Sequence, residues 1–589
     1  MDHRIKQLEA RVEELARQVV ELRDQMSALE TLGRAPAEPR PPSVVRVPRE
    51  AALPTALPTA AMRTVSLIGR TLVVLGGAYL LRAITDASVV PKAGGVVAGL
   101  AYAVWWLARC DRDAATGGRP SAIFHGLAAA VIAFPLIAET TARFGVLSAP
   151  AGAAVLLAFL ALGLAVALHR DLAAVGSITT LFALATALVL LVATRDLMPY
   201  LLTLVAAAVA VEALAFRDRW PGLRWPAAIA LDLGVLSMAT VLARPGGSPE
   251  GYAPVSLQAA VAVQLLLPLL YAASIAARTL LRLRPLTAFE AVQTSVALLV
   301  GLSGASRLGA RAGTESAAGL VCLLLAIVGY AGAFAVLEPR GRRDASFHFQ
   351  ATLAGLLLLA GAASLLSGPA LAIGFLGLAL IGLGIGSRSN RPVLVFHGVA
   401  YLVAAASLTG LVGSAADAVL ASAVHSWREL SGVGGLAFLA AAIGYGLLLA
   451  GPQPPGARRW HRLPHALVVI LVGSGVLAVT VRGLVLALGA GPGPAADAAV
   501  VATVRTAVLA LIAVLLAWAG RRFGLPELTW IVYPVLVCGG VKLLFEDLRH
   551  GRPATLFLSL TMYGGALLAT PRLLRREVLA ASDAKAEES

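Results

Sequence analysis

Apolar stretches of about 20 residues follow one another along most of this chain and constrain its fold more than any other feature. A helix of about 20 apolar residues is long enough to cross the roughly 30 Å hydrocarbon core of a bilayer. The stretches predict eighteen such helices, at 66–84, 93–108, 121–138, 149–168, 172–193, 199–216, 227–243, 255–277, 288–305, 317–337, 349–366, 370–386, 393–413, 432–450, 465–489, 499–519, 527–545 and 553–571. We therefore expect an all-α, polytopic transmembrane protein whose first partner is the lipid bilayer.

The composition excludes an ordinary cytosolic enzyme. Of the 589 residues, 58% are apolar and 14% are charged, whereas soluble domains have about 45–50% apolar and about 25% charged residues. The formal net charge of +15 is compatible with nucleic-acid binding, but the arginines are spread in twos and threes between the apolar stretches. Nucleic-acid binding requires basic residues that cluster on one face. We therefore expect no nucleic-acid partner.

The basic residues also predict the orientation of the chain in the membrane. Cytoplasmic loops carry an excess of Lys and Arg. If the amino terminus is cytoplasmic, the eight loops on that side hold 20 Lys and Arg residues and the nine outer loops hold 9. One missed or extra span would reverse this bias in every later loop, and no reversal is found. The sequence thus predicts a multi-pass protein with both termini in the cytoplasm.

A soluble segment precedes the first apolar stretch. Apolar residues recur from Ile5 to Leu29 at alternating spacings of three and four, with Leu at every d position. This heptad pattern is typical of a parallel two-stranded coiled coil, although a single amphipathic helix on the membrane would share it. We predict a cytoplasmic coiled-coil helix at 1–32 that forms a homo-oligomer through residues 5–29. A Pro-rich linker at 33–64, a transmembrane domain at 65–571 and a cytoplasmic tail at 572–589 complete the expected organisation.

Several segments resemble one family of membrane proteins. The heptad helix, the Pro-rich linker, residues 68–70 (IGR) and residues 75–82 (LGGAYLLR) resemble the start of the domain of unknown function 2339 proteins of bacteria. Residues 167–176 (ALHRDLAAVG) are similar to a family segment between two spans, and Trp220 also stands where that family places a Trp. The resemblance extends to about residue 230, and residues 177–180 (SITT) replace an expected Gly-Gly stretch. It implies a many-span protein of the bacterial inner (cytoplasmic) membrane, and it supplies no catalytic residues.

Polar residues inside the predicted spans are the first candidates for a functional site, because ionisable groups are rare in hydrocarbon and often functional. Four of them could line a hydrophilic path: Glu212, Asp232, Gln264 and Glu290. Asp232 lies several residues into its predicted helix, whereas both glutamates lie nearer the predicted cytoplasmic ends. The alternative is that each residue is structural and reaches either the membrane interface or a partner on a neighbouring helix.

A dense polar segment at the outer end of the seventeenth predicted span is the second candidate. It contains Lys542, Glu546, Asp547, Arg549 and Arg552. Lys542 and Glu546 are four apart and Glu546 and Arg549 three apart, so a helix would place them on one ion-paired face. Such a site could bind an anionic headgroup or a glycan phosphate. The alternative is a solvated hairpin whose charges pair with one another.

Two predicted helices open with the same signature, R-P-x-x-x-F-H-G, which begins at Arg119 and at Arg391. Pro fits the first turn of a helix, where its missing N–H costs nothing. Duplication of two-helix units would explain the repeat, and coincidence among Arg- and Pro-rich loops is the alternative.

The sequence contains few candidate catalytic or metal-binding residues. Asp111 and Asp113 have the D-x-D spacing that can chelate a divalent metal, but charged loops often contain this pattern by chance. We expect no catalytic residue, no metal and no cofactor. Because the spans exceed what an anchor needs, we predict binding or translocation of a small or lipid-linked solute. Two alternatives stay open: a non-catalytic scaffold that organises envelope proteins through its coiled coil, and a multispan glycosyl- or acyltransferase.

Overall fold

A computed structural model describes residues 91–587, except 342, 423–426, 453–458 and 490–496. The predicted coiled coil, the Pro-rich linker and the predicted span 66–84 lie outside the described residues. The elements described are helical, without a strand among them. The α-helices are α3 (Lys92–Ala115), α4 (Arg119–Ala142), α5 (Ala149–His169), α6 (Ala173–Ala193), α7 (Leu197–Phe216), α8 (Arg224–Leu242), α9 (Leu257–Ala276), α10 (Ala288–Ala312), α11 (Glu315–Ala331), α12 (Ala345–Leu365), α13 (Gly368–Arg388), α14 (Pro392–Leu408), α15 (Leu411–Leu420), α16 (Gly432–Ala450), α17 (Leu463–Ala487), α18 (Ala498–Phe523), α19 (Pro526–Lys542), α20 (Leu548–His550) and α21 (Pro553–Glu587).

The helices agree with the apolar stretches of the sequence. Sixteen of them are long and apolar enough to cross a membrane, and the bent pair α14 and α15 raises the number to 17 if it is one span. Each predicted stretch from 93–108 onward coincides with one of these helices or with the bent pair. The bend of 61° falls at Gly410, whose left-handed φ of 78° favours glycine.

Helix starts follow local capping rules. Ser148, Ser256 and Ser431 each accept a hydrogen bond from the backbone N–H three residues further on. Asp344 and Asp497 accept from two backbone N–H groups each. These caps satisfy donors that a helix end leaves without intrahelical partners. The starts of α5, α9, α12, α16 and α18 are therefore specified by the local sequence.

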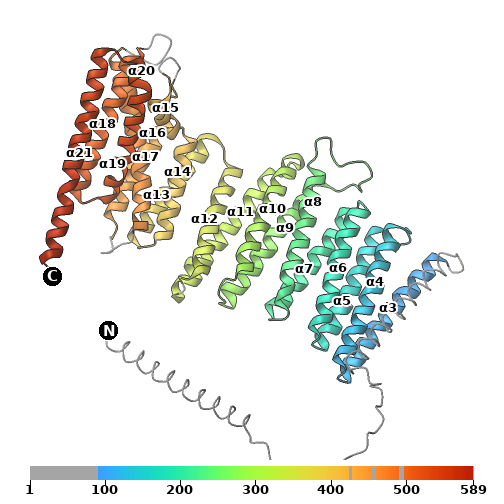
Figure 1. The fold of residues 1–589 in the computed structure, drawn as a ribbon. Helices are drawn as coiled ribbons and strands as arrows, with labels where there is room; N and C mark the ends of the chain where they lie inside the picture. The colour runs from blue at the N-terminus through green and yellow to red at the C-terminus, as the bar shows by residue number, and fades with distance from the viewer. Residues whose placement is uncertain (1–90, 342, 423–426, 453–458, 490–496, 588–589) are drawn as a thin grey trace, which may run out of the picture. The chain divides into compact units, whose positions relative to one another are not determined.

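The main contacts join each described helix to helices no more than three places away in chain order (Figure 1). One apolar core extends from α3 to α11 and a second from α13 to α17. Small residues allow close approach in both: a Cβ at Gly398 of α14 would lie 2.8 Å from the backbone nitrogen of Leu383 on α13. Close packing of this kind holds helices together where lipid removes the hydrophobic driving force.

The two copies of the R-P-x-x-x-F-H-G signature begin α4 and α14, but their histidines have different partners. His125 lies 3.1 Å from Asp113, on the helix before it. His397 lies 2.9 Å from the hydroxyl of Tyr330, on α11. The local sequence is thus repeated, while the contacts that it makes are not.

Ion pairs connect consecutive turns at the helix ends that are predicted to be cytoplasmic. The pairs are Asp111–Arg170 at 2.7 Å, Asp171–Arg219 at 2.5 Å, Asp218–Arg284 at 2.5 Å, Glu338–Arg391 at 2.9 Å and Glu527–Arg462 at 3.3 Å. Asp171 and Asp218 have left-handed backbone angles, φ 53° and 61°, which Asp tolerates better than most residues. Part of the arginine excess at this end is therefore neutralised within the protein.

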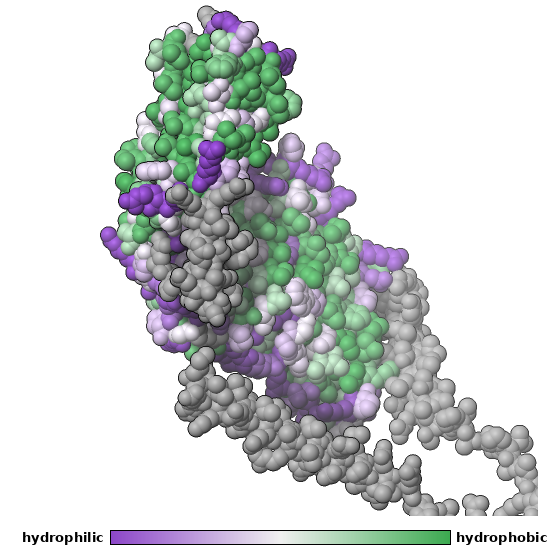
Figure 2. Space-filling model, turned by 60° about the vertical axis from the view of Figure 1, so that its left-hand side comes forward, coloured by the Kyte–Doolittle hydropathy of each residue, from purple (hydrophilic) through white to green (hydrophobic). Residues whose placement is uncertain are grey.

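The surface is that of a protein in lipid. Large apolar side chains are exposed on most of the described helices, and Figure 2 shows broad hydrophobic areas on one face with hydrophilic residues in separate patches. Soluble proteins rarely expose apolar patches of this extent. The chain is therefore an integral, multi-pass membrane protein, and the bilayer covers these faces.

Candidate functional site

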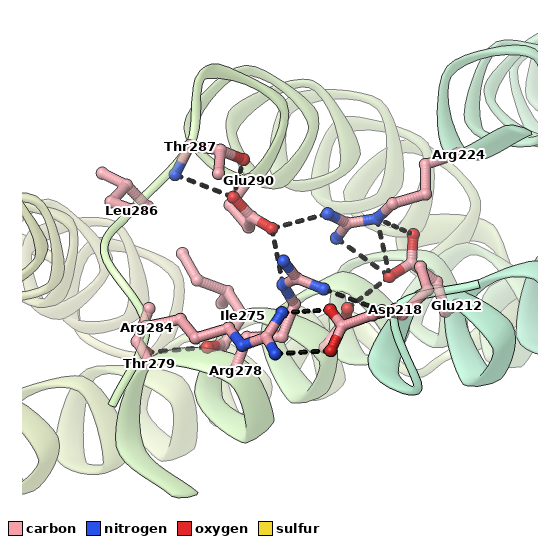
Figure 3. Close-up of polar contacts among 12 residues, drawn as sticks. Glu212, Asp218, Arg224, Ile275, Arg278, Thr279, Arg284, Leu286, Thr287 and Glu290 are labelled. Atoms are coloured by element: carbon pink, nitrogen blue, oxygen red, sulfur yellow. Dashed lines mark hydrogen bonds and ion pairs between the residues drawn. The ribbon is translucent and has the colours of Figure 1, made fainter. Parts of the chain in front are cut away.

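Helices α7 to α10 share a group of buried charged side chains near their predicted cytoplasmic ends (Figure 3). Arg224, the first residue of α8, lies between Glu212 of α7 and Glu290 of α10. Its Nε and one terminal nitrogen each donate to Glu212 at 3.0 Å, and the other terminal nitrogen donates to Glu290 at 2.5 Å. The guanidinium also lies 4.0 Å from the ring centroid of Phe289. One arginine thus joins three helices.

Both glutamates have further donors. The hydroxyl of Ser274 on α9 donates to Glu212 at 2.5 Å. Arg278 Nε lies 2.9 Å from Glu290, and the backbone N–H of Thr287 donates to Glu290 at 2.8 Å. Together with the arginine of α8, these contacts give every carboxylate oxygen a donor and balance two cations with two anions. Buried charges are tolerated when they are paired and hydrogen-bonded in this way.

The local sequence explains why Arg224 is buried. Trp220 has a left-handed φ of 47° and Pro221–Leu223 form a single 3-10 turn, so the chain reverses at once and α8 begins at Arg224. The positive-inside count treats this arginine as a loop residue, and the structure corrects that assignment. Pro226 is the signal that sequence reasoning missed, because Pro fits the first helical turn and so places Arg224 inside the helix.

A more exposed ion pair lies beside this group. Arg284 donates to both carboxylate oxygens of Asp218, one of them at 2.5 Å (Figure 3). Both residues lie in connections outside the spans. The hydrogen bond from Arg284 lowers the pKa of the Asp218 carboxyl below its usual value. Asp218 is therefore ionised at neutral pH and connects the turn after α7 to the turn before α10.

Asp232 lies deeper in α8, where its carboxylate contacts an amide rather than a cation. Gln293 Nε2 of α10 donates to its two oxygens at 3.0 and 2.9 Å, and Asp232 is only 9% exposed. Within the described ranges, no Lys, Arg or His forms an ion pair with it. An ionised carboxylate in apolar surroundings is costly unless its charge is compensated. The surroundings of Asp232 therefore favour either protonation of its carboxylate or binding of a cation beside it.

Gln264 of α9 approaches α8 and α10 further from the predicted cytoplasmic end. Its Nε2 donates to the carbonyl of Val235 at 2.9 Å, while its Oε1 is buried and accepts no hydrogen bond from the residues that the structure describes. Pro268 cannot donate to the backbone carbonyl of Gln264. A Cβ at Gly301 of α10 would lie 2.5 Å from that carbonyl oxygen. Three helices thus meet closely around Gln264.

Tyr271 of α9 is a further buried side chain beside the charged group. Its ring centroid lies 6.4 Å from that of Phe289, the ring that also contacts the guanidinium of Arg224. From Ser274 to Gln264 the helix rises about 15 Å, which is about half the hydrocarbon thickness. We use the name α7–α10 polar column for Glu212, Arg224, Asp232, Gln264, Tyr271, Glu290 and Gln293.

All four path residues expected from the sequence belong to the α7–α10 polar column. Of the other three members, Gln293 is a polar residue inside a predicted span, whereas Arg224 and Tyr271 were not expected there, because an isolated Arg or Tyr near a span end has no distinctive sequence pattern. Cavities of about 50, 280 and 550 Å³ occur among the described residues, and other residues line them. The column is therefore a series of buried polar side chains in which Glu212, Arg224 and Glu290 form one bonded group and Asp232 and Gln293 another, and it is separate from these three cavities.

The polar segment at the end of α19 forms a second buried group. Lys542 Nζ lies 2.8 Å from Asp547 Oδ2 and 3.3 Å from Glu546 Oε2. Arg505 of α18 donates to Glu546 at 2.7 Å and to the carbonyl of Ala421 at 2.7 Å. The buried cations here are thus already neutralised by protein groups.

The two remaining residues of that candidate lie on the surface. Arg549 is exposed, and Arg552 forms an ion pair with Asp497 at 3.1 Å. A π-helical turn at Leu543–Asp547 changes the helical register, so Glu546 contacts Arg505 rather than Arg549. The structure brings Lys542, Glu546 and Asp547 together and leaves the two arginines outside their group.

The D-x-D carboxylates are also engaged by protein groups. Asp111 accepts two hydrogen bonds from Arg170, and Asp113 accepts one from Ser121 at 2.6 Å. Across the described residues, no three His, Cys, Asp or Glu side chains are grouped to hold a metal ion.

Comparison with known proteins gives no family for this chain. It matches no known family model, no curated protein and no solved structure. The resemblance to the domain of unknown function 2339 proteins therefore stays a prediction, and any function has to be argued from the chain's own geometry.

Proposed function

We propose that this protein binds and translocates a small solute, and that the α7–α10 polar column is its path. In this proposal, Asp232 takes up and releases a proton or a small cation as the solute crosses the membrane. The observation that carries the proposal is the contact of a buried Asp232 with the amide of Gln293 and with no cation in the described residues. Intramembrane carboxyl groups of this kind are characteristic of proton relays in transporters.

The neighbours of Asp232 support this role. The charged group formed by Glu212, Arg224 and Glu290 lies on the predicted cytoplasmic side, and Gln264 lies on the other side with a buried side-chain oxygen to which none of the described residues donates. A solute with an N–H or O–H group would supply that donor. We place the protein in the bacterial inner membrane with both termini cytoplasmic as part of the same proposal, on the arginine bias of the loops.

Labelling with dicyclohexylcarbodiimide, an apolar reagent for protonated carboxyl groups, tests this assignment. The full-length protein is treated in detergent between about pH 5 and pH 9, and labelled peptides are identified by mass spectrometry. We expect Asp232 to react and its labelling to fall as the pH rises. Glu212, which is paired with Arg224, is the internal control and should stay unlabelled. Unlabelled Asp232 at every pH, or equal labelling of both residues, would contradict the proposal.

A scaffold is the second candidate function. It is favoured by the complete pairing of Glu212, Arg224, Arg278 and Glu290, because charges that satisfy one another serve packing rather than transport. Under this alternative, the predicted coiled coil is the functional element. Deletion of residues 1–32 should then lower the oligomeric state, measured from the mass of the complex in detergent. It should also abolish a cellular phenotype that Asp232→Asn leaves intact. Transport predicts the reverse: Asp232→Asn abolishes the phenotype at unchanged protein abundance.

A further inference from the structure

A cavity of about 280 Å³ lies at the predicted cytoplasmic ends of α13, α14, α16 and α17. Six of its lining residues carry basic or amide side chains: Arg343, Asn390, Arg391, His461, Arg462 and His465. The first five come from the α11–α12, α13–α14 and α16–α17 connections, and His465 lies in the first turn of α17. None of them belongs to the α7–α10 polar column.

Backbone geometry fixes the arginine of the second connection at the cavity. Asn390 has a left-handed φ of 51°, and the backbone N–H of Arg391 donates to the carbonyl of Gly386 at 2.9 Å. The turn is therefore tight, and α14 begins at Pro392. A Cβ at Gly386 would lie 2.7 Å from the backbone nitrogen of Val395, so the ends of α13 and α14 are in close contact.

Two carboxylates, the half-buried Glu338 and the buried Glu527, contact the three arginines. Arg343 donates to Glu338 at 2.6 Å and Arg391 lies 2.9 Å from the same carboxylate. Arg462 lies 3.3 Å from Glu527. Arg343 and Arg391 share the single negative charge of Glu338, so one positive charge is in excess between them, and each guanidinium has five N–H donors, of which that carboxylate uses only some. Glu338 therefore orients Arg343 and Arg391 without neutralising both.

The other side of the cavity is apolar. Val395, Phe396 and Leu448 line it, and Phe396 is 42% exposed on a surface that we assign to lipid. A ligand that fits both sides has an anionic head and an apolar attachment. Guanidinium groups from three connections match a tetrahedral phosphoryl group better than a planar carboxylate, because phosphate oxygens accept from several directions.

We propose that this cavity binds the phosphoryl group of an anionic ligand, either a phospholipid headgroup or a soluble phosphate ester. The purified full-length protein in a neutral detergent is titrated with dioctanoyl phosphatidylglycerol, with inorganic phosphate and with dioctanoylglycerol, which lacks the phosphate. Binding is measured as the shift in thermal unfolding temperature with ligand concentration. We expect phosphatidylglycerol to bind and dioctanoylglycerol to bind at least about tenfold more weakly, because charge-assisted hydrogen bonds are lost. Binding of phosphate alone would identify a soluble ester, and binding of the lipid alone would identify a headgroup.

Variants distinguish the cavity from general electrostatic attraction. Arg391→Gln and Arg343→Gln should each weaken binding about tenfold or more. Arg119→Gln removes the same charge from the same R-P-x-x-x-F-H-G signature at α4, outside the cavity, and should have no effect. If Arg391→Gln does not fold, Arg343→Gln tests the proposal alone. The Arg343 side chain is 56% exposed, and its removal leaves the ion pair between Arg391 and Glu338 in place. The proposal is overturned if neither phosphorylated probe binds, if dioctanoylglycerol binds equally well, or if Arg119→Gln has the same effect as the cavity variants.

Discussion

Replacement of Arg224 by glutamine is the sharpest test of the buried charge group. The change removes all the guanidinium donors that reach Glu212 and one that reaches Glu290. Among the partners that the structure describes, Glu290 keeps Arg278 and Thr287, whereas Glu212 keeps Ser274 alone. Most of the penalty therefore falls on Glu212. Loss of one partner from a buried ion pair costs about 3–5 kcal/mol, and we expect Arg224→Gln to lower the free energy of unfolding by that amount.

The free energy of unfolding can be measured by steric trapping of the full-length protein in bicelles. The double variant Arg224→Gln, Glu212→Gln removes the uncompensated carboxylate as well, so it should recover about 2 kcal/mol or more relative to Arg224→Gln alone. Arg219→Gln is the matched control. It lies in the same connection but is exposed and paired with Asp171, and it should cost less than about 1 kcal/mol.

Two results would refute this reasoning. A loss below about 1 kcal/mol for Arg224→Gln would mean that water or lipid headgroups reach Glu212 and solvate it. Additive effects of the two substitutions would mean that Arg224 and Glu212 do not interact in the membrane.

Three further predictions rest on other contacts. Gly301→Ala should lower the free energy of unfolding by about 1–3 kcal/mol, because the added Cβ would lie 2.5 Å from a backbone oxygen of α9. Gly483→Ala is the control: its Cβ would have no atom within 4 Å, so the change should be neutral or stabilising. Equal effects of the two variants in the same assay would contradict the packing of α9 on α10. The pKa of Asp218 is lowered by Arg284 in the folded protein, so its stabilising contribution is present above the usual aspartate pKa and is lost as the pH falls through the lowered value. The difference in unfolding temperature between the wild type and Asp218→Asn should therefore be constant from pH 7 to pH 5 and shrink below about pH 4; a difference that grows with acidity would show that the pair does not form. Lys542→Met should lower the free energy of unfolding by about 3–5 kcal/mol, because Glu546 and Asp547 lose the cation that they share. An unchanged unfolding temperature would contradict this prediction and would mean that Lys542 is solvated by water.

The apolar stretches and local turn chemistry determined the secondary structure of the described chain. Hydropathy over about 20 residues is a local property, so each stretch from 93–108 onward coincides with a described helix or with the bent pair. The stretch 393–413 predicted one continuous helix, whereas the structure has α14 and α15 with a bend at Gly410. The predicted coiled coil at 1–32 and the predicted span 66–84 lie outside the described residues and stay predictions.

The partners of the charged residues were decided only by the tertiary structure. Asp232 and Gln293 are 61 positions apart, and Arg224 and Glu290 are 66 apart. An ion pair or hydrogen bond requires side chains within about 3–4 Å. Which residues come that close depends on helix rotation and on the neighbour that each helix packs against. Glycines such as Gly301 and Gly398 permit those close approaches. The mean hydropathy of a stretch does not show on which side of the helix each glycine lies. The sequence therefore determined which charges enter the membrane, and the packing of the helices decided which of them neutralise one another and which, like Asp232, contact no cation among the described residues.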